Sequence, residues 1–327
     1  MKAKKLIPIL AIMLSLSSFA SCTAGNQTLE LAAYWGTNKT PDVTYTEELE
    51  YDVTFTKGDG LKTVGYDLNY PKGKYKTKLE QKQDKTYEYT TELTIDVIYT
   101  LDGQDPFIRQ DKTTTKVQFE ATTDNLRPIY SEKTIVCYSP LLASDPEKVE
   151  DCYFGGKAIE YSIITNYTED GKGTTVKTNL ADQEVEELSF KQGSKYTFFD
   201  NEQLPFALRA ISADVTTAKI KTYSAFAEDT QTVAISFSEE ADSALTLENL
   251  IININNDNPD GNKKTASYSY REASMKIDSN GSNSGVTRTL YLTTKEKDRN
   301  MILKMETPLS YSLGTLTYTL TSIMRTE

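Results

Sequence analysis

From Tyr87 to Leu101 the sequence reads YEYTTELTIDVIYTL, and this stretch decides the fold. Every second residue is apolar, aromatic or threonine, and the residues between them up to position 96 are glutamate, threonine or aspartate. Alternation with a period of two is typical of a β-strand with one dry face and one wet face. A strand of this length extends about 50 Å, well beyond the usual five or six residues. Such strands favour a large curved antiparallel sheet over a compact sandwich.

Shorter runs with the same alternation recur through the chain, separated by turn signals such as Asp59-Gly60, Asp102-Gly103 and Asn280-Gly281. The further predicted strands are 43–55, 64–70, 117–121, 159–167, 233–237, 266–270, 286–292, 301–305 and 316–320. In the first of these runs the apolar side chains hold the odd positions, and Glu47 is the one polar exception. No regular helical period interrupts the strands, which disfavours a parallel α/β sheet.

One segment in the middle of the chain predicts a helix, from Asp200 to Ile211. Asp200 can cap its first turn, and Leu204, Leu208 and Ile211 share one face. That apolar face must bury against the only large apolar surface available, which is the sheet. We therefore expect a mostly β protein: a long antiparallel curved sheet, or open β-barrel, with one short helix on its concave face.

The chain begins with a basic region, Lys2 to Lys5, followed by a predominantly apolar stretch of fifteen residues from Leu6 to Ala20. A membrane-spanning helix needs about 20 apolar residues, so this stretch fits a signal peptide better. The end of this stretch and the two residues after it, Phe19-Ala20-Ser21-Cys22, resemble the lipobox of bacterial lipoproteins. That resemblance implies cleavage before Cys22 and a lipid on its thiol; the alternative is ordinary secretory cleavage near Ala20.

These features divide the chain into a signal peptide (1–21), a tether (22–42) and a single β domain (43–327). The lipobox resemblance implies a location outside the cytoplasm, with the domain lipid-anchored to a bacterial envelope membrane. Two or three acyl chains anchor a protein stably, at about 0.8 kcal/mol for each buried CH2 group.

The composition excludes several classes of function. The formal net charge is −11, and loss of the three lysines in residues 1–21 makes it −14, so the surface repels nucleic acid and no nucleic-acid partner is expected. Histidine is absent from the whole sequence, which excludes Ser-His-Asp and Cys-His catalysis and His-ligated metals. We expect no cofactor and no metal.

Besides Cys22 the chain holds only Cys137 and Cys152. Outside the cytoplasm such a pair favours a disulfide, which would close an insertion near 137–152 and stabilise by about 3 kcal/mol in the chain-entropy model. Two buried thiols or a redox pair are the alternatives.

Three short stretches resemble the uncharacterised envelope proteins of the DUF3108 type, whose open β-barrel is similar to that of lipoprotein-carrier proteins. They are the residues 125–131, the segment 200–210 with its Leu-Arg-Ala ending, and the strands within 289–320. The resemblance implies the same open barrel, and it carries over neither an activity nor catalytic residues. The insertion near 137–152 and the Asn-rich stretch after Ile251 depart from it.

Acidic pairs are the only catalytic candidates in the sequence. Glu47-Glu48, Glu186-Glu187 and Glu239-Glu240 lie in polar surroundings that predict exposure, and an exposed acid is a poor general acid at neutral pH. A carboxylate-dependent hydrolase is therefore the least favoured function. The run from Asn256 to Gly261 begins like a calcium-binding loop, but Ser267 holds the place of the required glutamate, so a hairpin turn is preferred.

The tyrosines are the remaining signal, since the chain has 21 of them against one tryptophan. Tyrosines at strand spacing are usually core residues, but an uncovered part of the concave face would form a groove for an acyl chain or a glycan. The leading hypothesis is thus a non-enzymatic envelope protein that binds a hydrophobic ligand or has a structural role. The alternative is a cell-surface module that recognises glycans or a protein. The candidate ligand-binding residues are Tyr87, Tyr89, Tyr99, Tyr268, Tyr270, Leu204 and Leu208.

Overall fold

The structure, a computed structural model, describes residues 44–62, 66–84, 86–101, 103, 105–121, 126–138, 159–169, 172–191, 198–224, 229–278, 287–295, 298–309 and 312–327. Within these ranges one 16-stranded sheet contains all the strands. The signal peptide, the tether and most of the insertion near 137–152 lie outside the described residues.

The sheet has two halves that meet at β1 (Thr46–Lys57), which pairs with β16 (Gly314–Thr326) on one side and β3 (Gly73–Gln81) on the other. The N-terminal half continues through β4 (Tyr87–Leu101), β5 (Phe107–Ala121), β6 (Leu126–Cys137), β7 (Ile159–Tyr167), β8 (Lys172–Asn179) and β9 (Val185–Lys191), and β2 (Tyr66–Asn69) pairs with β4. The C-terminal half runs through β10 (Phe198–Asp200), β11 (Thr217–Ser224), β12 (Asp229–Ile254), β13 (Lys263–Asp278), β14 (Thr287–Thr293) and β15 (Ile302–Pro308) to β16.

Strand β4 has the bounds that its alternation predicts, and it sets the length of the N-terminal half. It pairs with β5 from Tyr87 opposite Phe119 to Tyr99 opposite Phe107, without a register shift. Its inward tyrosines are buried, and its glutamates and the threonines at even positions lie on the other face. Because the period of two matches the pleat over the whole strand, one side of the sheet is dry and the other is wet.

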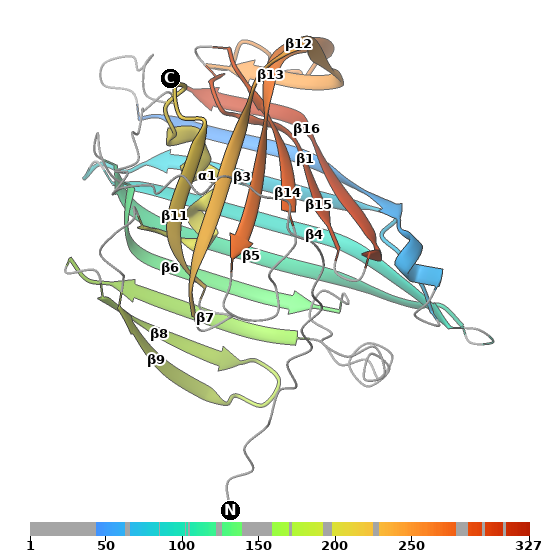
Figure 1. The fold of residues 1–327 in the computed structure, drawn as a ribbon, viewed down its shortest axis with the longest axis vertical. Helices are drawn as coiled ribbons and strands as arrows, with labels where there is room; N and C mark the ends of the chain where they lie inside the picture. The colour runs from blue at the N-terminus through green and yellow to red at the C-terminus, as the bar shows by residue number, and fades with distance from the viewer. Residues whose placement is uncertain are drawn as a thin grey trace, which may run out of the picture.

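Strand β12 closes part of the C-terminal half, the strands β12 to β16, into a ring. It has 26 residues, and its register against β13 shifts at three places between Phe237 and Leu250. Such bulges bend a strand. After them, residues Ile251 to Ile254 pair in parallel with β16, so that β12 to β16 form a ring while β3 to β9 continue as an open layer (Figure 1).

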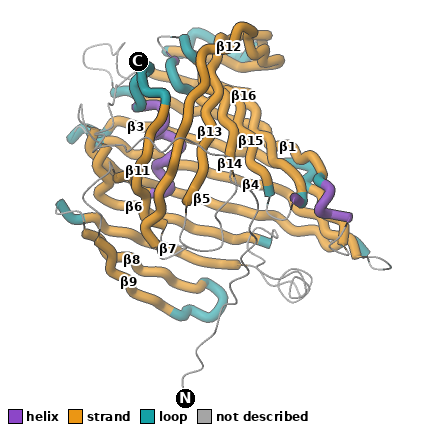
Figure 2. The backbone as a smooth tube through the Cα atoms, viewed as in Figure 1, coloured by secondary structure: helices purple, strands orange, loops and turns teal. Residues whose placement is uncertain are grey.

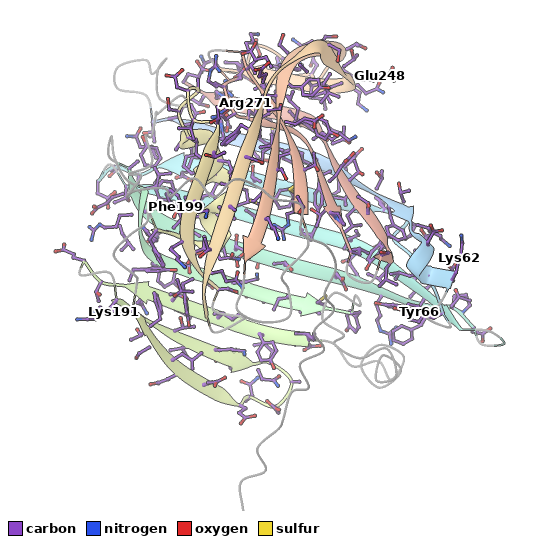
Figure 3. All side chains as sticks on the ribbon, viewed as in Figure 1. Lys62, Tyr66, Lys191, Phe199, Glu248 and Arg271 are labelled. Atoms are coloured by element: carbon purple, nitrogen blue, oxygen red, sulfur yellow. The ribbon has the colours of Figure 1, made fainter. Side chains whose placement is uncertain are left out.

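The two edges of the sheet, β9 and β10, approach each other through aromatic side chains. Phe190 of β9 stacks on Tyr223 of β11, with 3.7 Å between ring centroids, and lies 6.4 Å from the ring of Phe198 in β10. In Figure 3, Lys191 marks the outer end of β9, and the buried Phe199 of β10 lies beside β11, with which β10 pairs. The barrel is therefore open in its hydrogen bonding but is joined at this edge by side-chain packing.

The predicted helix is present and lies on the concave face, between β11 and the layer of β4 to β6 (Figure 2). It consists of a 3-10 turn (Asn201–Gln203), one α-helical turn, α1 (Leu204–Ala207), and a second 3-10 turn (Leu208–Ala210). The prediction of a single apolar face differs from the structure, because Leu204 and every residue from Phe206 to Ile211 are buried. The cause is that both halves of the sheet cover the segment.

The fold class is thus confirmed as mostly β, a curved antiparallel sheet with one short helix in its concavity. None of the described helical segments is long and apolar enough to cross a membrane.

Candidate functional site

The helical segment is held in place by polar contacts at its beginning. The Oδ1 atom of Asp200 accepts a hydrogen bond from the backbone N–H of Glu202 at 2.7 Å, as expected of an N-cap. Pro205 lies in the first α-helical turn, where its missing N–H costs nothing. The Nε2 atom of Gln203 donates to the carbonyl of Leu126 at 3.1 Å, which fixes the segment against β6.

A narrow cavity lies between this segment and the sheet. Its volume is about 20 Å³, room for about one water molecule. The concave face is therefore largely filled by side chains in this state. The residues that line the cavity are Glu47, Leu49, Tyr51, Tyr75, Thr77, Leu79, Tyr89, Pro205, Phe206, Arg209, Ile302, Met305 and Tyr318.

Five of the thirteen residues that line the cavity are aromatic. The ring centroids of Tyr75 lie 5.7 Å from Tyr51 and 5.6 Å from Tyr318, and Phe206 of the helix lies 5.5 Å from Tyr89. These spacings are those of packed aromatic pairs. Burial raises the pKa of the Tyr51, Tyr75, Tyr89 and Tyr318 hydroxyls, so all four rings stay uncharged.

One end of the cavity is charged. Glu47 is 4% exposed and Arg209 is 3% exposed, and Nη1 of Arg209 pairs with Oε1 of Glu47. The other oxygen of Glu47 accepts from Nη2 of Arg325 at 2.6 Å and from the hydroxyl of Tyr45 at 3.1 Å. Burial lowers the pKa of Arg209. One carboxylate is thus shared by two buried guanidinium groups from α1's segment and from β16.

The sequence-based expectation that Glu47 is exposed was wrong. Glu47 holds an odd position in β1 and faces the interior with its apolar neighbours, where the two arginines neutralise it. The pairs Glu186-Glu187 and Glu239-Glu240 are exposed, as predicted. The signal for Glu47 was its place on the apolar face of an alternating run.

A second polar cluster lies at the beginning of the helical segment. The hydroxyl of Tyr167 donates to Oδ2 of Asp200, and Lys133 pairs with Glu202 at 2.9 Å. Burial, followed by repulsion from Glu202, raises the pKa of Asp200 to about 6. A cavity of about 10 Å³ beside these groups has too little room for a ligand.

We expect Asp200→Asn to change how stability depends on pH. Because the pKa of Asp200 is raised from 3.8 to about 6, the folded state holds this proton more tightly than the unfolded chain does. The carboxyl therefore lowers stability as the pH rises through that window, by about 3 kcal/mol in all. Urea unfolding at pH 4 and at pH 7 measures this effect. From pH 4 to pH 7, the free energy of unfolding of Asp200→Asn should increase by about 2–3 kcal/mol relative to that of the wild type.

Asparagine keeps an acceptor for the Glu202 amide, so the cap remains in that variant. The exposed Asp260 offers a matched control, since Asp260→Asn should follow the wild-type pH profile. A constant difference between Asp200→Asn and the wild type at both pH values would contradict the expectation.

The structure places one of the predicted ligand-binding residues at the cavity and the others away from it. Tyr89 lines the cavity. Tyr87, Tyr99, Tyr268, Leu204 and Leu208 are buried elsewhere in the core, and Tyr270 is half-buried. Tyr87, for example, stacks on Phe119 at 5.6 Å between centroids. Their role in binding stays a prediction, and the other rings of the cavity wall were not foreseen.

The cysteine predictions fall mostly outside the described residues. Cys22 and Cys152 both lie there, so lipidation and the disulfide stay predictions. Cys137 is described and buried, and its Sγ lies 3.5 Å from a carboxylate oxygen of Asp111. In the part of the chain that the structure describes, no group of three or more carboxylate or thiol side chains is arranged to hold a metal ion.

Comparison with known proteins supports the fold alone. No family model and no curated protein matches the chain. The chain is similar to the crystal structure of a β-barrel-like protein of a domain of unknown function, DUF1849, from Brucella abortus. The TM-score is 0.51 at 12% identity, covering 86% of this chain and 97% of that one. This similarity shows a β-barrel-like architecture, for which no function is known. It does not show that the chain belongs to the DUF3108 family.

Proposed function

We propose that this protein is a non-enzymatic binding protein that holds a hydrophobic ligand between its central helical segment and the tyrosine-bearing face of the sheet. The observation that supports this is the cavity itself, which lies inside a barrel and is lined by apolar and aromatic side chains with one charged end. Binding sites for small molecules have this composition, and they lie preferentially in barrels.

The ligand enters as the helical segment moves away from the sheet. A site for a ligand of ordinary size needs roughly 300 Å³ or more, whereas the cavity has about 20 Å³. The segment has a single α-helical turn, Leu204–Ala207, flanked by 3-10 turns. So short an element is held by its packing and polar contacts with the sheet rather than by its own hydrogen bonds, so a ligand that replaces part of these contacts can displace it.

We further propose that a lipid on Cys22 tethers the protein to the outer side of a bacterial envelope membrane. The support is the lipobox-like Phe19-Ala20-Ser21-Cys22 after a signal-type apolar stretch. In this position the domain would take its ligand from, or deliver it to, the membrane to which it is bound.

Both parts are tested with the full chain carrying Cys22→Ser. Native mass spectrometry and solvent extraction should find a co-purified apolar molecule, and added decanol should raise the melting temperature of stripped protein. The variant should leave the membrane fraction in which the wild type sediments. A stripped protein that takes up no decanol, and carries no apolar molecule from the cell, would remove the ligand proposal; a variant that still sediments with membranes would remove the anchor.

No specific observation favours recognition of glycans or of a protein partner. That hypothesis predicts exposed aromatic side chains grouped at strand ends. Among the described residues the large exposed hydrophobic side chains are Ile108, Val185 and Met324, none of them aromatic.

A further inference from the structure

The guanidinium of Arg209 is only partly satisfied by the protein. Its Nη1 pairs with Glu47, while its Nε and Nη2 atoms are buried and have no hydrogen-bond partner among the residues that the structure describes. Those two nitrogens lie on the same edge of the planar group. They are the pair that donates two parallel hydrogen bonds to one carboxylate, and leaving both unpaired in the interior is costly.

Besides Glu47, the hydroxyl of Tyr45 is the polar group that interacts with the guanidinium of Arg209, and that hydroxyl donates its proton to Glu47. One oxygen of Glu47 is used by Arg209, and the other is shared between Arg325 and Tyr45. Arg325 itself has two more partners, Asp298 at 2.8 Å and Glu327 at 3.1 Å. Asp298 and Glu327 therefore neutralise Arg325 without Glu47. Arg209 instead has one oxygen of the Glu47 carboxylate as its ion-pair partner among the described residues.

The unpaired edge belongs to a residue that lines the cavity, next to the apolar wall formed by Leu49, Tyr51 and Phe206. We propose that Arg209 binds the carboxylate of the ligand, which makes the ligand class of this site a long-chain carboxylic acid. This inference rests on the proposed function and narrows it. A phosphate monoester fits less well, because its second negative charge would meet the carboxylate of Glu47, which lies beside Arg209.

The test compares two probes of equal chain length, decanoate and decanol, by calorimetric titration of the Cys22→Ser chain at pH 7.5. Charge-assisted bidentate pairs predict that the protein binds decanoate roughly 10- to 100-fold more tightly than decanol. In Arg209→Met the two dissociation constants should agree within about threefold, a difference below 1 kcal/mol. Methionine keeps most of the arginine stem's volume, and Glu47 keeps Arg325 as a partner.

The control is Arg127→Met, which removes a half-buried arginine of β6 that pairs with Glu120 outside the cavity. It should keep the preference for decanoate. Equal affinity of the wild type for decanoate and decanol would overturn the role of Arg209 and leave the proposed function standing. Failure of the wild type to bind either probe would overturn both. Tighter binding of decyl phosphate than of decanoate would overturn the carboxylate class.

Discussion

Glu47→Gln should destabilise the protein by about 3–5 kcal/mol, the range observed when one partner of a buried ion pair is removed. Glutamine keeps the shape of the side chain but leaves Arg209, which is 3% exposed, without a counterion in the interior. The amide oxygen of glutamine still accepts from one of the two arginines, and Asp298 and Glu327 still neutralise Arg325. The free energy of unfolding from urea titration, followed by far-UV circular dichroism, measures the loss.

The neighbouring residue provides the matched control. Glu48 follows Glu47 in β1 and is half-buried on the opposite face of the sheet, so Glu48→Gln should change stability by less than about 0.5 kcal/mol. The double variant Glu47→Gln/Arg209→Met removes both members of the pair. Because it leaves no uncompensated charge on the helical segment, it should be more stable than Glu47→Gln alone, with a coupling of about 1–3 kcal/mol. Equal losses for Glu47→Gln and Glu48→Gln would contradict the interpretation.

The strands that were predicted from the sequence share a period of two with one clear apolar face. β4 and β7 have the predicted bounds because turn residues and the hydrophobic pattern end at the same positions. β3 and β8 were not predicted, since GKYKTKLEQ and KGTTVKTN contain too few apolar residues to mark a face. Each is placed by pairing with strands on both of its sides, which is information that a local window does not contain.

The candidate site was predicted only in part, and for a physical reason. The aromatic rings of the cavity wall come from four strands and the helical segment, and some of those in contact are far apart in sequence, as are Tyr75 and Tyr318. Register between distant strands decides which tyrosines meet, and a single sequence does not contain it. Arg209 was visible as a lone basic residue in an apolar helix, and Glu47 as a lone acid on an apolar strand face. Together these two exceptions were a signal for the buried ion pair at the charged end of the cavity, which the expected exposure of Glu47 passed over.

Phe206→Ala should cost about 3–5 kcal/mol, because the ring is 2% exposed and packs 5.3 Å from Phe119 and 5.5 Å from Tyr89 between centroids. Removing it leaves a hole that joins the existing cavity. Phe206→Leu, which refills most of the volume, should cost less than about 2 kcal/mol. Chemical unfolding of the two variants gives both values.

The same variant probes the opening of the site. If ligand entry requires the helical segment to leave the sheet, weakening its packing raises the population of the open form, and the apparent affinity for an apolar ligand rises with that population. Phe206→Ala should therefore bind decanol more tightly than the wild type although it is less stable, and decanol should raise its melting temperature by the larger amount. Weaker binding by Phe206→Ala would mean that the ring is itself a ligand contact in a preformed site. The stability loss and the affinity gain have one origin, since Phe206 occupies the space that the ligand would take.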